Sequence, residues 1–151
     1  MEDTYLDKSD LAAILPHGIE FVFIDLVKSF CPVKQALVSE FFVNTEDKRI
    51  KGHFADRIIF PAIFQIEAMA QSSGVLLHLL ERDTFGGTEQ TLQGYLIQNK
   101  ISFKRIVYPG SKIEIHTSIK QRFGNNTEFN VICNVDGHRV SHGTLQIAVQ
   151  K

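Results

Sequence analysis

The chain has few of the features that would mark it as a secreted, membrane-spanning or nucleic-acid-binding protein. Its 151 residues include only two cysteines, Cys31 and Cys133, which we expect to be small buried thiols rather than a disulfide framework. The formal net charge of −1 gives bulk electrostatics no reason to favour nucleic acid. The N-terminal residues are acidic and polar, without the layout of a signal peptide. We therefore predict a cytoplasmic protein.

Long apolar runs are also absent. The longest one is interrupted before it reaches the roughly 18 residues of a membrane span. The interrupting residues are Gln65, Glu67, Gln71 and His78. The composition, 44% hydrophobic and 22% charged, is instead that of an ordinary globular protein. With no internal repeat or linker, residues 1–151 are expected to form a single domain.

The first third of the chain predicts a short helix followed by two strands. Ser9 is placed to cap a helix over residues 11–15. Two runs rich in β-branched and aromatic residues, 21–30 and 35–43, are typical of paired strands. The polar stretch 44–51 is expected to be a loop.

The rest of the chain predicts one long helix and then more strands. Pro61 is suited to the first position of a helix that runs to about Arg82, because that position needs no N–H. Asp136-Gly137 is a typical tight-hairpin turn. Four further strands are predicted over residues 91–107, 112–121, 128–135 and 139–149. Two strands, one helix with apolar residues nearly all round and four strands predict an α+β fold, in which an antiparallel sheet wraps around the helix.

Glu67 is the first candidate for chemistry. A carboxylate in an otherwise apolar helix is costly unless it is paired or neutral. Burial favours the neutral form, which suits a proton donor near neutral pH. A purely structural role, in which Glu67 bonds a neighbouring side chain and fixes the packing, is about equally compatible with the helix alone.

His53 and the start of the long helix are the second and third candidates. His53 follows Gly52, which permits close approach of a ligand. Phe60, at the expected capping position, cannot accept a hydrogen bond, so the N–H groups of Ala62 and Ile63 are free to polarise a carbonyl oxygen. A carbonyl held there beside a base would suit removal of a proton α to a thioester, although a solvated loop histidine is the commoner case.

Several of these residues belong to a longer pattern. Leu15-Pro16-His17 is followed by Phe21 to Asp25, by Gly52-His53-Phe54, and by a P-x-x-x-Q-x-E-A-M-A-Q run from Pro61 to Gln71. In order and spacing this pattern resembles the 3-hydroxyacyl-[acyl-carrier-protein] dehydratases of bacterial fatty-acid synthesis. The resemblance runs from about Leu11 to the C-terminus. It implies a hot-dog fold, a homodimer with one continuous sheet and, in many members, a trimer of such dimers.

The resemblance also implies roles for individual residues. His53 would be the base that takes the C2 proton, and Glu67 of the partner subunit would protonate the departing 3-hydroxyl group. Gln71, one helical turn later, would orient the carboxylate. The other residues expected to bind substrate are Phe54, Ala62, Ile63 and Phe64. The reaction would need no metal or organic cofactor, and its substrate would be carried by an acyl carrier protein.

The chain departs from the family pattern at four places. Ala55-Asp56 stands where the family has Pro-Gly, Ala62 where it has Gly, Gly18 where it has Arg, and Glu20 where it has Pro. These departures affect the expected substrate more than the reaction type. Two other functions stay open: a hot-dog acyl thioesterase, which would not need His53, and a non-catalytic acyl-thioester binding protein.

Overall fold

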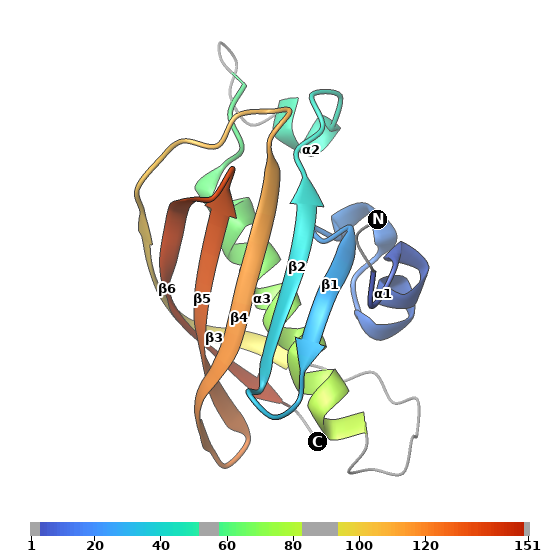
Figure 1. Ribbon diagram of the computed structural model, residues 1–151, viewed down its shortest axis with the longest axis vertical. Helices are drawn as coiled ribbons and strands as arrows, with labels where there is room; N and C mark the ends of the chain where they lie inside the picture. Colours follow the sequence, from blue (N-terminus) through green and yellow to red (C-terminus); the bar gives the residue numbers. More distant parts are fainter. Residues whose placement is uncertain (1–3, 52–57, 83–93, 150–151) are drawn as a thin grey trace.

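The computed structural model describes residues 4–51, 58–82 and 94–149. Six antiparallel strands form one sheet in the order β1-β2-β4-β5-β6-β3, and a long helix lies across one face of it (Figure 1). The strands are β1 (Leu26–Cys31), β2 (Ala36–Phe42), β3 (Gly94–Phe103), β4 (Lys112–Phe123), β5 (Asn126–Val135) and β6 (His138–Val149). The helices are α1 (Lys8–Ile14), the 3₁₀ turn η1 (Ile19–Phe21), α2 (Lys48–Lys51) and α3 (Ala62–Arg82). The predicted α+β fold, with its two strands, one long helix and four strands, is confirmed.

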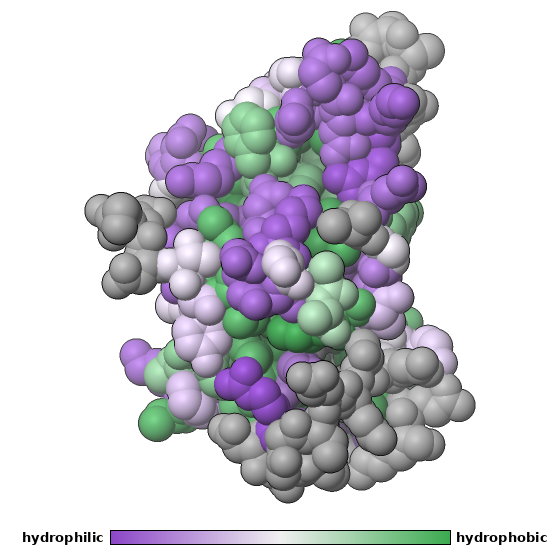
Figure 2. Space-filling view, turned by 90° about the vertical axis from the view of Figure 1, so that its right-hand side faces the viewer, coloured by the Kyte–Doolittle hydropathy of each residue, from purple (hydrophilic) through white to green (hydrophobic). Residues whose placement is uncertain are grey.

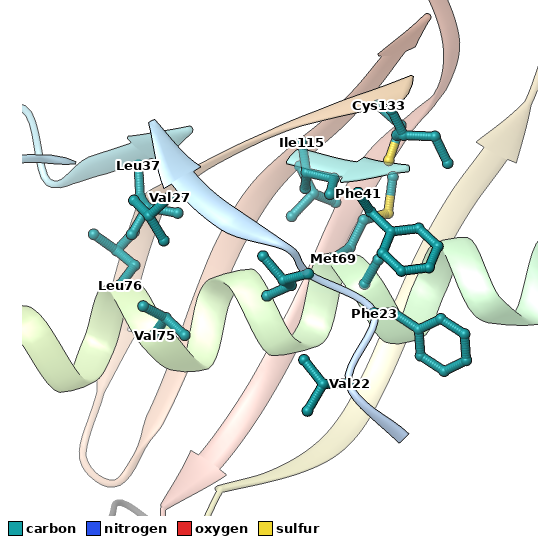
Figure 3. Close-up of a cluster of buried hydrophobic side chains, with 14 of the residues drawn as sticks. Val22, Phe23, Val27, Leu37, Phe41, Met69, Val75, Leu76, Ile115 and Cys133 are labelled. Atoms are coloured by element: carbon teal, nitrogen blue, oxygen red, sulfur yellow. The ribbon is translucent and has the colours of Figure 1, made fainter. Parts of the chain in front are cut away.

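The core lies between α3 and the sheet. β4 and β5 alternate between buried and less buried residues, as strands with one covered face do. From the helix, Met69 and Leu76 are fully buried. Figure 3 shows Leu76 pointing from α3 towards Val27 of β1 and Leu37 of β2.

Two glycines meet backbone requirements of the sheet. Asp136 and Gly137, with φ of 52° and 77°, form the tight β5–β6 turn expected from the sequence. Gly143 of β6 has a φ of 157°, and a side chain there would overlap the carbonyl oxygen of Lys100 in β3. Glycine at this position therefore lets β6 bring β3 close.

Three details of the N-terminal third differ from the sequence-based prediction. α1 is capped by Asp7, not Ser9, because the carboxylates of Asp7 and Asp10 each accept the other residue's N–H in a capping box. The predicted strand 21–30 begins only at Leu26. The expected loop 44–51 contains the short helix α2.

The two cysteines are free thiols in different surroundings. Cys133 is buried as expected, and burial raises the pKa of its thiol to about 12. Cys31 is only half-buried.

None of the helices in the described ranges is long and apolar enough to cross a membrane.

The two edges of the sheet are treated differently. The edge of β1 is covered by the chain itself, because Val27 exchanges backbone hydrogen bonds with Leu6. On the opposite edge, Tyr95, Leu96 and Ile97 of β3 have exposed fractions of 52%, 40% and 49%.

On the face of the molecule that Figure 2 shows, hydrophilic and hydrophobic residues are mixed.

Candidate active site

Glu67 lies in the second turn of α3; the Gln71 amide donates a hydrogen bond to one oxygen of its carboxylate, and the His17 ring lies within ion-pair distance of the same oxygen. The Gln71 amide nitrogen lies 3.0 Å from Glu67 Oε1, and His17 Nε2 lies 3.1 Å from it. The bond from Gln71, four residues further along the helix, is the one that the sequence predicts. Glu67 is therefore paired, yet its side chain remains 27% exposed.

Gln71 is held rigidly because every polar atom of its side chain is used. Its Oε1 accepts the N–H of Phe23 at 2.8 Å, and its Nε2 donates to the carbonyl oxygen of Phe21 at 2.9 Å. The helix thus satisfies backbone groups of residues 21–23 that a neighbouring strand would otherwise bind. These bonds tie the orientation of the Glu67 carboxylate to that segment.

Arg49 of α2 fixes the same segment from the other side. Its guanidinium donates to the carbonyl oxygens of Glu20 at 2.8 Å and Val22 at 3.2 Å, and lies 4.1 Å from the centre of the Phe23 ring. Asp47 holds the guanidinium through its carboxylate, and that hydrogen bond lowers the pKa of Asp47. Phe23 is in turn stacked on Phe64 at 4.7 Å.

His17 follows Pro16 just after α1 and reaches Glu67 from outside the helix. Its ring stacks on Phe21, with 6.4 Å between centroids and 18° between planes. Its second nitrogen, Nδ1, is buried and has no hydrogen-bond partner in the described part of the chain. His17 is therefore the only side chain outside α3 that the described residues place against the Glu67 carboxylate.

A groove of about 290 Å³ begins at Glu67 and His17 and runs along α3. On α3 it is lined by Ala70, Gln71, Gly74, Leu77 and His78, of which Ala70 and Gly74 are small. The other walls are formed by Ile14, Leu15, Pro16, Gly94, Tyr95, Leu96, Ile147 and Val149. A carboxyl group thus stands at one end of a mainly apolar groove.

Helix geometry explains why this groove is continuous. Gly74 and His78 lie seven and eleven residues after Glu67, close to two and three full turns, so the three share one face over roughly 16 Å. A Cβ atom at Gly74 would meet nothing within 4 Å. At the far end, burial and the neighbouring charge of Arg82 lower the pKa of His78, so its ring is neutral near pH 7.

The other predicted site residues lie at the start of α3, away from this groove. Ala62 and Ile63 are exposed, and Phe64 packs among Phe23 and Phe60. The helix begins at Ala62, so Pro61 rather than Phe60 holds the capping position, and the Pro61 carbonyl oxygen accepts the N–H of Phe64 at 3.0 Å. Ala62 and Ile63 remain predicted substrate contacts.

His53 and Phe54 lie outside the described residues, as do Ala55 and Asp56. The structure brings Glu67 and Gln71 together and adds His17, Gly74 and His78, which sequence reasoning did not select. The signal for His17 was its place in the Leu-Pro-His motif. Nothing in the sequence indicated that it meets Glu67, 50 residues away. Among the described residues no group of three or more potential metal ligands gathers.

Comparison with known protein families gives a match over most of the chain. Residues 15–144 match the model of the FabA-like domain. A 3-hydroxyacyl-[acyl-carrier-protein] dehydratase FabZ from Latilactobacillus sakei is 30% identical over 145 residues, which is 96% of this chain and 99% of the relative. The match therefore includes the whole of the groove-lining helix.

Solved structures agree on the fold. The dehydratase heterocomplex ApeI:P from Xenorhabdus doucetiae aligns with a TM-score of 0.79 at 18% identity, over 93% of this chain and 91% of its own. A mutant of the thioesterase PA1618 from Pseudomonas aeruginosa aligns at 0.69 and 12% identity, over 96% and 94%. Since a dehydratase and a thioesterase both align, these likenesses support the architecture alone.

Proposed function

We propose, from the premise that this chain belongs to the FabA-like domain family, that it is a 3-hydroxyacyl-[acyl-carrier-protein] dehydratase. It interconverts 3-hydroxyacyl and trans-2-enoyl thioesters in fatty-acid or related acyl-chain synthesis. The observation that carries this interpretation is the carboxyl group of Glu67 at the end of an apolar groove, with one oxygen contacted by both Gln71 and His17. A carboxyl group so placed can transfer a proton to a substrate whose chain lies in the groove.

The reaction needs one proton removed and one supplied. A base takes the proton from C2, the C2–C3 double bond forms, and the C3–O bond breaks. Glu67 gives its proton to the departing oxygen, so that water leaves and the carboxylate remains. The C2 proton on the base is then exchanged to restore both groups. His53 is the proposed base, from its place in the Gly-His-Phe motif.

The groove is the proposed place of the acyl chain. Its walls are mainly aliphatic, and its volume, near the lower end of the usual range for ligand pockets, fits a slender chain. Ile63 and Phe64, which the sequence predicts to bind substrate, lie instead at the start of α3, which would receive the thioester end.

A second copy of the chain is the proposed partner at β3. β3 is the last strand at its edge of the described sheet and carries exposed apolar residues, and proteins ordinarily cover or blunt such an edge. Pairing of β3 with β3 of another copy would extend the sheet and would place a partner's residues beside Glu67. A trimer of such dimers, an acyl carrier protein as substrate carrier and a cytoplasmic location remain predictions from the resemblance.

The activity test uses the purified chain with 3-hydroxyacyl and trans-2-enoyl thioesters, followed by the absorbance of the conjugated product. Glu67→Gln keeps the size of the side chain but removes the transferable proton. We expect it to lower kcat by about 10² to 10⁴. Glu81→Gln is the matched control on the same helix, because Glu81 pairs with Arg122 outside the groove. We expect this variant to keep wild-type activity.

Two outcomes would replace the proposal. Release of free thiol without enoyl product would favour the thioesterase. No turnover over several chain lengths, with retained binding of acyl thioester, would favour the binding protein. For the partner, light scattering should give a dimer that Ile97→Lys dissociates and Val33→Lys, at the 92% exposed β1–β2 turn, does not. A monomeric wild type would contradict the shared site.

A further inference from the structure

We infer that His17 is a positioning residue for Glu67: its Nε2, 3.1 Å from Oε1, holds that oxygen in place and leaves Oε2 for the reacting groups. This inference rests on the proposed dehydratase function. It assigns to His17 no transfer of a proton to or from the substrate.

The first support is the choice of oxygen. Both nitrogens that the described residues bring to the carboxyl group, Gln71 Nε2 and His17 Nε2, meet Oε1. Two contacts to one oxygen fix the orientation of the carboxyl group, and no side-chain hydrogen bond or ion pair within the described residues involves Oε2.

The second support is the surroundings of the His17 ring. Nε2 faces Oε1 of the Glu67 carboxyl group. Nδ1 is buried and has no partner among the described residues, so in this part of the chain the ring makes its one polar side-chain contact with Glu67.

The third support is that the His17 ring is fixed in orientation but remains partly exposed to the groove. Pro16 restricts the backbone before it, and Phe21 stacks on its face. The carbonyl oxygen of Phe21 also accepts from Gln71, so both side chains that contact Glu67 are fixed to one short segment. Yet the His17 side chain is 30% exposed and lines the groove. A residue needed only for packing has no reason to face the cavity.

Few other charges act on this pair within the described residues. The remaining titratable groups that line the groove are His78 on α3 and Tyr95 on β3. His78 lies eleven residues beyond Glu67, about 16 Å along the axis. Within the described residues, the pair therefore depends mainly on its own 3.1 Å contact and on Gln71.

Three substitutions separate positioning from packing and from proton transfer. His17→Gln keeps an N–H donor without a titrating ring, His17→Phe keeps the stacking on Phe21 without a donor, and His17→Ala removes both. We expect His17→Ala and His17→Phe to lower kcat by up to about 100-fold with little change in KM. We expect His17→Gln to recover most of that loss and to keep both limbs of the wild-type pH profile.

Other results would overturn the inference. Recovery by His17→Phe but not His17→Gln would show a packing role. Loss of one limb of the pH profile in His17→Gln would show that His17 itself transfers a proton. Wild-type kcat in His17→Ala would show that the contact of His17 with Glu67 has no role in catalysis.

A measurement on the wild-type protein keeps the inference testable whatever the variants do. Long-range ¹H–¹⁵N NMR of the imidazole ring should show the Nε2 signal of His17 move in Glu67→Gln, because this atom lies against the Glu67 carboxyl group. An unchanged signal would refute the inference while leaving the dehydratase activity intact. Conversely, absence of enoyl product beside the expected change would refute the function and not the contact.

Discussion

The two faces of α3 use polar residues in opposite ways. On the face against the sheet, buried side chains find partners on three different strands. Ser72 meets Ser39 of β2 at 2.7 Å, and Ser73 meets Thr117 of β4 at 2.8 Å. Ser141 of β6 donates to Gln65 at 2.8 Å. On the groove face, the described residues provide no hydrogen-bond partner for Oε2 of Glu67 or for the ring of His78.

This difference distinguishes polar residues of α3 that stabilise the fold from polar residues that serve the site. A buried polar group whose hydrogen bonds are complete fixes how the helix crosses the sheet. A polar group beside a cavity that lacks a hydrogen-bond partner lowers stability unless a ligand or solvent supplies one. Such groups are found mainly at binding and catalytic sites. The sheet face should therefore control stability, and the groove face should control activity.

The largest expected effect is on the sheet face. Met69→Ala would leave a cavity among fully buried neighbours and should lower the free energy of unfolding by about 2–5 kcal/mol. Glu67→Gln on the groove face should change it by far less, because the amide can still accept at Oε1. Urea unfolding of both variants checks the contrast. Equal losses would contradict the division of the helix into two roles.

A double-mutant cycle sharpens the comparison at a smaller scale. Ser39→Ala or Ser72→Ala alone leaves one buried hydroxyl group unpaired, and each should cost about 1–3 kcal/mol. The double variant replaces both hydroxyl groups by apolar hydrogen and should cost less than the sum. The same urea experiment measures the coupling. Strict additivity would show that the 2.7 Å contact contributes nothing.

Those features that depend on local pattern could be predicted from the sequence. Pro61 and the apolar run after it located α3 to within one residue. Asp136-Gly137 located the β5–β6 turn because few residues other than these tolerate two consecutive positive φ values. The bond from Gln71 to Glu67 followed from helical spacing. In each case a few neighbouring residues determine the geometry.

Features that depend on contacts across the fold could not. Residues 21–25 have strand composition, but Gln71 takes the N–H of Phe23 and the carbonyl oxygen of Phe21. Asp25 bonds the N–H of Phe42 at 2.6 Å through its side chain, where a strand would use its backbone. His17 meets Glu67 only because this segment folds back onto α3. Its role therefore emerges from tertiary structure and not from the motif alone.

A specificity change tests the groove face directly. Gly74→Leu places a large side chain where a Cβ atom would meet nothing within 4 Å, so it should fill the groove without straining the fold. We expect kcat/KM for long-chain thioesters to fall about 10-fold or more relative to short-chain ones. Gly74→Ala, the control, should raise the free energy of unfolding by up to about 1 kcal/mol and keep the preference. An unchanged chain-length profile in Gly74→Leu would place the acyl chain elsewhere.

The smallest expected effect is the contribution of His78, at the far end of the groove, to the pH dependence of stability. Burial and the charge of Arg82 lower the pKa of His78 below its ordinary value of about 6.5. The unfolded chain therefore takes up a proton at this residue more readily than the folded one as the pH falls through about 6.5, so acid should reduce stability there and have no such effect above it. His78→Gln removes this contribution, and the difference between its unfolding free energy and that of the wild type should narrow as the pH falls from 8 to 5. The exposed His138, changed to Gln, is the control, with a difference that stays flat. An acyl thioester in the groove would exclude water from His78 and enlarge the effect, so the same pair of variants, measured with and without ligand, tests whether the chain reaches this end.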